Sequence, residues 1–352
     1  MKIALVAPPF IAVPPKKYGG TELFVAELAE GLQREGAKVV LYANGESTAS
    51  VEIRSIYAEE EWPVQQDNVE ASLKGLSHAA WAVHDASQTA DVIHVNSAPG
   101  LSFSRFVNQP FVYTVHHAYE QTLAEYYEKL PEVQYVTISD FQQQKLRLPH
   151  MRTIHHGIKP SLYQLQESKQ RYLCFLGRVA PPKGTHLAIE IAKKSGISLK
   201  IAGEIQPIYQ QYWEAQVKPQ VDGTFIEYVG ELGHDAKNAL LGNSMALLFP
   251  IQWDEPFGLV MIEAMACGTP VLAMPGGSVA EVVKEGVGGH VRSSTDELAG
   301  CARNLKIAAK DVRRYMEENF SVERMVKDYL KLYFDIASGK AQPSGEQESK
   351  VA

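Results

Sequence analysis

Short apolar runs rich in β-branched residues alternate with longer amphipathic segments along most of the chain. In the first half this pattern predicts strands at residues 3–7, 38–43, 92–95, 112–116 and 134–139, with helices at 21–35 and from Asp140 onward. Such alternation is typical of βαβ units, because a parallel sheet that is buried on both faces needs helices to cover it. The first half therefore predicts one parallel sheet with covering helices.

The same pattern restarts near residue 172 and predicts a second sheet. Strands are expected at residues 172–176, 198–203, 225–229, 246–250 and 270–273, and helices at 185–195, 236–241, 296–318 and 321–337. A further short helix carries Glu263 and runs into the last of these strands. We therefore expect an α/β protein made of two Rossmann-like, doubly wound parallel-sheet domains that face each other across a cleft.

Composition places the boundary between the two domains. Residues 159–170 are polar and contain Pro160, as expected of a hinge. The predicted domains are residues 1–165 and residues 170–320. A helix at 321–337 is expected to pack back on the first domain, and residues 338–352 to form a flexible tail.

The bulk properties exclude several classes of protein. The net charge of −7 gives no electrostatic case for nucleic-acid binding. No apolar run approaches the roughly 18 residues that a membrane-spanning helix needs, so at most peripheral membrane contact is expected. Three scattered cysteines without metal-ligand spacing are expected to be reduced thiols in a cytoplasmic protein.

Two carboxylates stand eight residues apart around a predicted helix N-terminus. Glu255 precedes the turn formed by Phe257 and Gly258, and Glu263 lies on the helix about one turn in. The amides of Gly258 and Leu259 would be free to bind an anionic ligand such as a phosphate, helped by the helix dipole. Glu263 has apolar neighbours, so it needs a partner or a ligand, and the two vicinal hydroxyls of a ribose would suit it.

Two cations lie in a loop that follows a predicted strand. Arg178 offers a planar fork of donors and Lys183 a point charge, a suitable pair for a diphosphate. The ordinary alternative is a pair of solvated surface cations. The position of the loop at the carboxyl end of a strand favours ligand binding, because ligands of open α/β sheets bind there.

These motifs resemble a known enzyme family over nearly the whole chain, up to about Ala337. The Glu255-x7-Glu263 block, the Gly-Arg-x4-Lys-Gly loop and the Gly-Gly turn ending at Gly20 resemble the retaining, nucleotide-sugar-dependent glycosyltransferases of family 4, group 1, which have the GT-B fold. The resemblance implies transfer of a hexose to a hydroxyl acceptor with retention of configuration. A UDP-sugar is the favoured donor and GDP-mannose the other option, with no metal and no cofactor.

The resemblance also implies roles for individual residues. Glu255 would contact the donor sugar, Glu263 the ribose, and Arg178 with Lys183 the diphosphate. The loop at Gly20 would lie over the donor phosphate. The nucleotide sugar would bind to the domain of residues 170–320, and residues 1–165 would form the acceptor side. The acceptor would be a glycan, a lipid-linked glycan or a small molecule. The family usually has an acidic residue just before the lysine, where this chain has two prolines.

A histidine completes the set of candidates. His116 ends a buried strand, where the family has a histidine that approaches the donor sugar and the acceptor hydroxyl. The family usually follows it with aspartate, and here His117 takes that place, so the local charge differs. His94, His155 and His156 are expected to be structural. Two alternatives stay open: a sugar-nucleotide epimerase on the same fold, and a catalytically silent glycosyltransferase-like binding subunit.

Overall fold

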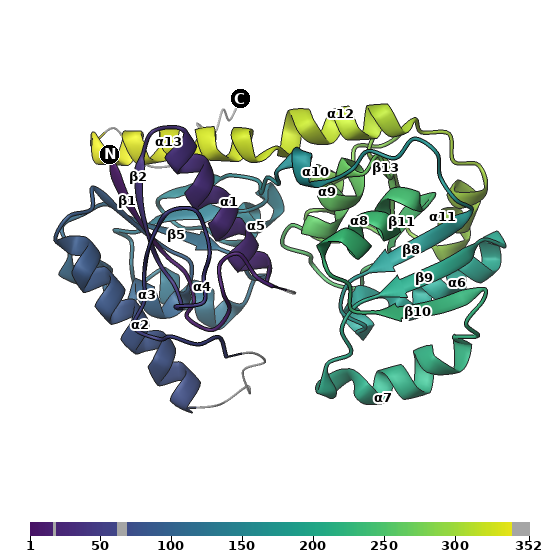
Figure 1. Cartoon of the computed structure of the whole chain (residues 1–352), viewed down its shortest axis with the longest axis horizontal. Helices are drawn as coiled ribbons and strands as arrows, with labels where there is room; N and C mark the ends of the chain where they lie inside the picture. Colours follow the sequence, from purple (N-terminus) through teal and green to yellow (C-terminus); the bar gives the residue numbers. More distant parts are fainter. Residues whose placement is uncertain (17–18, 62–68, 340–352) are drawn as a thin grey trace, which may run out of the picture. The chain divides into compact units, whose positions relative to one another are not determined.

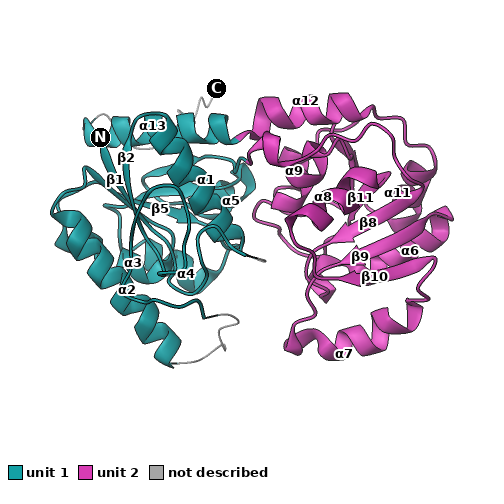
Figure 2. Cartoon of the chain, viewed as in Figure 1, with its two compact units in different colours: residues 1–157, 322–352 teal, residues 158–321 magenta. Residues whose placement is uncertain are grey.

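The computed structural model describes residues 1–16, 19–61 and 69–339, and the chain divides into two compact units (Figures 1 and 2). Unit 1 comprises Met1–Gly157 and Val322–Ala352, and unit 2 comprises Ile158–Ser321. The division after residue 157 falls earlier than the boundary at 165–170 expected from composition. Most of the predicted tail, residues 340–352, lies outside the described residues.

Unit 1 is built on a parallel sheet. Its described strands are β1 (Lys2–Val6), β2 (Lys38–Tyr42), β3 (Glu52–Arg54), β4 (Val92–Val95), β5 (Phe111–Val115), β6 (Gln134–Thr137) and β7 (Met151–Thr153). They are arranged in the order β3-β2-β1-β4-β5-β6-β7, and all neighbours pair in parallel. The order reverses between β1 and β4, which makes the carboxyl ends of these two strands the switch point of the sheet.

Helices cover both faces of this sheet. They are α1 (Gly20–Arg34), α2 (Val69–Ser87), α3 (Ala98–Leu101), α4 (Gln121–Tyr127), α5 (Asp140–Lys145) and α13 (Val322–Ala337), with a 3₁₀ turn η1 (Ser104–Phe106). Alternate residues of β1 enter two cores, because successive strand side chains point to opposite faces. Ile3 and Leu5 pack with α1 and α13, whereas Ala4 and Val6 pack with α2 and α4. The last helix of the chain is thus part of the core of unit 1 (Figure 2).

Unit 2 repeats the architecture with a second parallel sheet. Its strands are β8 (Tyr172–Leu176), β9 (Ser198–Ala202), β10 (Ile226–Gly230), β11 (Ala246–Phe249), β12 (Val271–Ala273) and β13 (Gly289–Val291). Their order is β10-β9-β8-β11-β12-β13, again parallel, with the switch point between β8 and β11. The two sheets confirm the predicted α/β class with two doubly wound domains.

The helices of unit 2 lie on both sides of its sheet (Figure 1). They are α6 (Thr185–Ser195), α7 (Gln210–Tyr212), α8 (His234–Asn243), α9 (Leu259–Ala266), α10 (Val279–Val282), α11 (Thr295–Arg303) and α12 (Ala309–Phe320). Short 3₁₀ or π turns occur at η2 (Pro160–Leu162), η3 (Pro181–Lys183), η4 (Pro207–Tyr209), η5 (Trp213–Val217) and η6 (Lys218–Gln220). Most predicted elements of this half are present within a few residues.

One predicted helix is wrong. The segment expected to be a single helix at 296–318 forms α11 and α12, separated by residues 304–308. The two pieces pack on different partners, α11 against α6 and α12 against α9, so the chain has to turn between them. Asn304 ends α11 in a non-helical conformation. Tertiary packing therefore overrides a continuous helical pattern here.

No helix in the described residues is both long enough and apolar enough to cross a membrane.

Candidate functional site

The loop that carries Arg178 and Lys183 and the loop that carries Glu255 lie together at the switch point of unit 2. Residues 177–184 follow β8 and residues 250–258 follow β11, the two strands that flank the reversal. The amide of Gln252 donates to the carbonyl of Pro182 at 2.7 Å. Gly184 has a φ of 71°, and a Cβ added there would lie 1.9 Å from the carbonyl oxygen of Pro250. Only glycine permits so close an approach.

Lys183 and Glu255 form an ion pair at this switch point. Lys183 Nζ lies 2.6 Å from Glu255 Oε2, and Glu255 is 7% exposed. Trp253 completes the group, because its indole Nε1 donates to the same carboxylate oxygen at 2.9 Å and its ring lies 4.6 Å from Lys183 Nζ. Lys183 and Glu255, which were predicted to contact the same ligand, thus lie side by side, and the indole of Trp253 holds the Glu255 carboxylate in place.

A second loop holds the backbone of Glu255 in place. The amide of Ser278 donates to the Glu255 carbonyl at 2.9 Å, and the Ser278 hydroxyl donates to the Phe257 carbonyl at 2.9 Å. Gly277 has a φ of 55°, and a Cβ there would lie 2.1 Å from the carbonyl oxygen of Glu255. Residues 274–278, which follow β12, therefore fix the position of the backbone at Glu255 and Phe257.

Helix α9 begins directly after this loop, with Gly258 as its N-cap. The first amides of a helix have no partner within it, so those at Gly258 and Leu259 are placed to bind an anion. The ring of Phe257 is 2% exposed and packs against Phe320 at a centroid distance of 6.0 Å. Phe257 can therefore reach a ligand only through its backbone.

Glu263 lies on α9 and has protein partners that its sequence neighbours do not reveal. It is 6% exposed and accepts hydrogen bonds at Oε1 from the Tyr163 hydroxyl, at 2.9 Å, and from Lys237. Lys237 comes from α8 and Tyr163 from the segment after η2. The buried charge is thus paired, as a buried carboxylate must be.

Arg178 is half-buried in the loop after β8. Its Nη1 donates to Gln206 Oε1 at 3.3 Å, and the amide of Gln206 donates in turn to Glu204 at 3.1 Å. Gln206 and Glu204 belong to the loop after the neighbouring strand β9. The guanidinium is therefore tethered at the same edge of the sheet as Lys183.

The switch point of unit 1 carries the remaining predicted residues. Gly20, the end of the predicted Gly-Gly turn, is the first residue of α1 and lies in the segment after β1. His116 follows β5 directly, and its Nε2 lies 3.0 Å from Oδ1 of Asn96, the residue after β4. Phe24 of α1 packs edge-on against the His116 ring at 4.9 Å. Asn96 did not stand out in the sequence.

Behind His116 lies a buried network that joins β4, β5 and α13. His94 contacts the hydroxyls of Tyr333 and Thr114 at 2.7 and 2.8 Å, and Thr114 contacts the hydroxyl of Tyr329 at 2.8 Å. Two tyrosines of the last helix therefore form hydrogen bonds with one residue of β4 and one of β5, each more than 200 positions earlier in the chain. His94 has the structural position that the sequence suggested.

Buried histidines should make unit 1 acid-sensitive. Burial lowers the pKa of His78 to about 4 and those of His94 and His116 to about 3, and it also lowers the pKa of His156 well below its usual value. Each of these groups binds a proton more readily in the unfolded chain, so unfolding becomes easier as pH falls below about 6.5. Glu22 acts in the opposite sense between pH 4.5 and 7, because burial raises its pKa to about 7.

We expect the four histidines to outweigh the one carboxyl, so that the free energy of unfolding of unit 1 falls between pH 6.5 and 5. The slope should approach about 1.4 kcal/mol per pH unit for each histidine. Urea titrations at several pH values measure it. His78→Gln should reduce the slope, whereas His84→Gln, on the exposed side of the same helix α2, should not. A pH-independent free energy would contradict the expectation.

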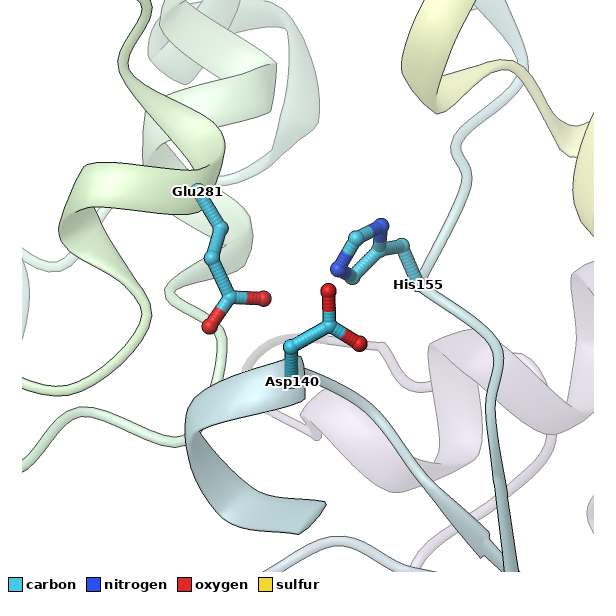
Figure 3. A group of neighbouring side chains, drawn as sticks. All are labelled: Asp140, His155 and Glu281. Atoms are coloured by element: carbon cyan, nitrogen blue, oxygen red, sulfur yellow. The ribbon is translucent and has the colours of Figure 1, made fainter. Parts of the chain in front are cut away.

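Asp140 and His155 of unit 1 offer possible metal ligands. Figure 3 shows Asp140 at the start of α5 and His155 in the segment after β7, and their ligand atoms lie within 4.8 Å of one another. Glu281, the third labelled side chain, stands on α10 of unit 2. A bound metal usually has three or more protein ligands, so this pair within unit 1 does not define a metal site.

Known structures share this fold over nearly the whole chain. A sucrose-phosphate synthase from Thermosynechococcus elongatus superposes with a TM-score of 0.79 at 19% identity, covering 96% of this chain and 99% of that one. HepE from Anabaena, solved in complex with UDP and glucose, superposes with a TM-score of 0.75 at 19% identity, covering 95% and 100%. The architecture is thus that of the two-domain GT-B glycosyltransferases.

Sequence comparison identifies the family. The model for Glycosyltransferase Family 4 matches residues 18–178, and the model for Glycosyl transferases group 1 matches residues 163–322. A glycogen synthase from Mycobacterium tuberculosis is 26% identical over 313 residues, 74% of this chain and 72% of that protein. The chain belongs to the family 4, group 1 glycosyltransferases, as its motifs predicted, and is related to glycogen and sucrose-phosphate synthases.

Proposed function

We propose that this glycosyltransferase moves a hexose from a nucleoside-diphosphate sugar, with a UDP-sugar favoured, to a hydroxyl acceptor with retention of configuration. The observation that carries the proposal is the meeting of two cations, a helix N-terminus and two buried acids at one switch point of unit 2. HepE, which has the same fold, was solved in complex with UDP and glucose, and this supports a UDP-sugar as the donor.

Each group of residues would bind a different part of the donor. Lys183 and Arg178, with the amides of Gly258 and Leu259, would bind the diphosphate. Glu263 would accept hydrogen bonds from the ribose hydroxyls, and Glu255 from hydroxyls of the sugar. As the glycosidic bond to the diphosphate breaks, negative charge grows on the leaving group, and donors already in place stabilise it without reorganisation. We propose that these groups provide the positive charge without a metal ion.

The ion pair of Lys183 with Glu255 has a consequence for binding. A diphosphate would compete with Glu255 for the lysine, so that binding exchanges one anionic partner for another. The carboxylate would remain held by Trp253 and would turn to the hydroxyls of the sugar. Donor binding and placement of Glu255 are therefore coupled.

The proposal is tested by supplying the purified protein with UDP-sugars and GDP-mannose in the presence of a chelator. We expect release of the nucleoside diphosphate from at least one UDP-sugar, faster with the correct acceptor. Arg178→Ala should lower the rate by one to several orders of magnitude, where each order corresponds to about 1.4 kcal/mol of barrier.

Arg171 provides a matched control, because it precedes β8 whereas Arg178 follows it. Arg171→Ala should leave the rate unchanged, since its position is at the opposite end of the same strand. Tight binding of UDP without any turnover would instead indicate a silent binding subunit. Conversion of a UDP-sugar into its epimer would indicate the epimerase alternative.

A further inference from the structure

Asn96 has an orientation that its hydrogen bonds determine. It is 5% exposed and follows β4 at the switch point of unit 1. Its backbone amide donates to the Val6 carbonyl at 2.9 Å, and its side-chain Nδ2 donates to the same oxygen at 3.4 Å. A backbone carbonyl oxygen only accepts hydrogen bonds, so the side-chain nitrogen faces β1.

This orientation directs the side-chain oxygen of Asn96 at His116. Oδ1 lies 3.0 Å from Nε2 of the imidazole. An amide oxygen only accepts, so Nε2 has to carry the hydrogen. A neutral imidazole has a single N–H, and Nδ1 is therefore left with its lone pair.

The ring of His116 is neutral and fixed in its plane. Burial lowers its pKa to about 3, so the imidazolium is absent near neutral pH. Phe24 packs edge-on against the ring at 4.9 Å, and His156 stacks on it at 5.6 Å with an angle of 14°. In the residues that the structure describes, Nδ1 of this half-buried histidine has no hydrogen-bond partner.

The hydrogen bonds of His94, in contrast, do not determine its tautomer. Both of its ring nitrogens contact hydroxyl groups, those of Tyr333 and Thr114. A hydroxyl can donate or accept by rotating its hydrogen, so these partners are compatible with either tautomer. Of these two histidines, only His116 has a tautomer that is set by an amide group.

We propose that Asn96 is a positioning residue that holds His116 in its Nε2–H tautomer, so that Nδ1 accepts a hydrogen bond from a hydroxyl of the sugar substrate. The identity of that substrate rests on the proposed function, whereas the tautomer does not. The imidazole would thus bind and orient a hydroxyl through an acceptor that is already in place.

The other titratable groups nearby favour the neutral ring. Around the ring and its neighbours Phe24 and His156 they include His94 on β4, His117 next in the chain, His156 after β7, and Arg324 and Tyr329 on α13. Helix α1, which packs on the ring through Phe24, also carries the buried carboxyls of Glu22 and Glu27. Besides burial, the charge that lowers the pKa of His116 is that of His117, so a proton on His116 gains no anionic partner among the described residues. A carboxylate at position 96 would provide one.

The test uses nitrogen NMR of the imidazole in protein labelled with ¹⁵N-histidine at pH 7.5, with His116→Gln to assign the signals. In the wild type we expect a pyridine-type Nδ1 and a pyrrole-type Nε2. Asn96→Asp, which keeps an acceptor for the Nε2 hydrogen, should retain this tautomer and raise the pH at which both nitrogens become imidazolium-type by at least about one unit. Asn96→Ser, which removes the amide, should give a mixture of the two tautomers and lower kcat about tenfold, with a smaller change in the KM for the donor.

Control variants separate the possible outcomes. Tyr333→Phe should shift the signals of His94 but not those of His116. The opposite tautomer in the wild type would overturn the proposal even if sugar transfer occurs. A mixture of tautomers in Asn96→Ser with an unchanged kcat would overturn the positioning role, and so would a single tautomer in that variant. An absence of any transfer in the wild type would count against the proposed function alone.

Discussion

Replacing Glu255 by glutamine should lower turnover by about two orders of magnitude or more while leaving the affinity for UDP unchanged or higher. The carboxylate is paired with Lys183 at 2.6 Å, so its charge competes with the diphosphate for that lysine. Glutamine ends this competition but provides a weaker acceptor for the hydroxyls of the sugar. Turnover and affinity are therefore expected to move independently.

Steady-state kinetics and isothermal titration with UDP measure the two quantities. Asp254→Asn is the matched control, because it removes the same charge from the adjacent residue, which is exposed. It should behave as the wild type in both assays. Equal losses of turnover and affinity in Glu255→Gln would argue against the assigned role, and so would an effect of the same size in Asp254→Asn.

Replacing Gly277 by alanine should lower turnover by at least about a hundredfold, because a shift of about 1 Å in a reacting group can have an effect of that size. The added Cβ would lie 2.1 Å from the carbonyl oxygen of Glu255 and 2.4 Å from its amide nitrogen. These backbone atoms have to move, and the carboxylate moves with them. Gly277 itself need not touch the substrate for this to happen.

Gly286→Ala is the control that separates displacement of the Glu255 backbone from backbone strain at a positive φ. Gly286 also has a positive φ, 73°, and an added Cβ there meets nothing within 4 Å. Gly286→Ala should lose stability on the order of 1 kcal/mol from backbone strain alone, and Gly277→Ala should lose more, because its Cβ also displaces the backbone of Glu255. Only Gly277→Ala should lose most of its turnover. Turnover close to that of the wild type in Gly277→Ala would show that the loop after β12 does not place Glu255.

Much of the fold follows from local pattern. The strands of both halves are short β-branched runs, and α1 and α6 have regular apolar spacing, so their residues can be recognised one segment at a time. Helix α2 was missed, although it is among the longest described. Its exposed apolar residues, Val69, Leu73 and Leu76, weaken the contrast between its two faces. The break between α11 and α12 depends on partners elsewhere in unit 2.

The candidate site was predictable only in part. Arg178, Lys183, Glu255 and Glu263 stand in recognisable motifs, and their positions at strand and helix ends follow from the parallel sheet. Their mutual contacts could not be predicted, because a partner such as Lys183 is 72 positions from Glu255 in sequence.

The residues that were missed have ordinary local sequences. Trp253, Lys237 and Tyr163 are recognised only when the chain brings them to a carboxylate. Two observations could have pointed to them: a buried acid needs a partner, and an indole N–H seeks an acceptor. Gly277 is likewise one glycine among many until the backbone beside it is known.

A crystal structure of the protein with UDP would show directly whether the nucleotide binds at the switch point of unit 2. We predict that the diphosphate contacts Lys183, Arg178 and the first amides of α9, with the ribose at Glu263 and the ion pair of Lys183 with Glu255 opened. A nucleotide bound away from the loops that follow β8 and β11 would contradict it.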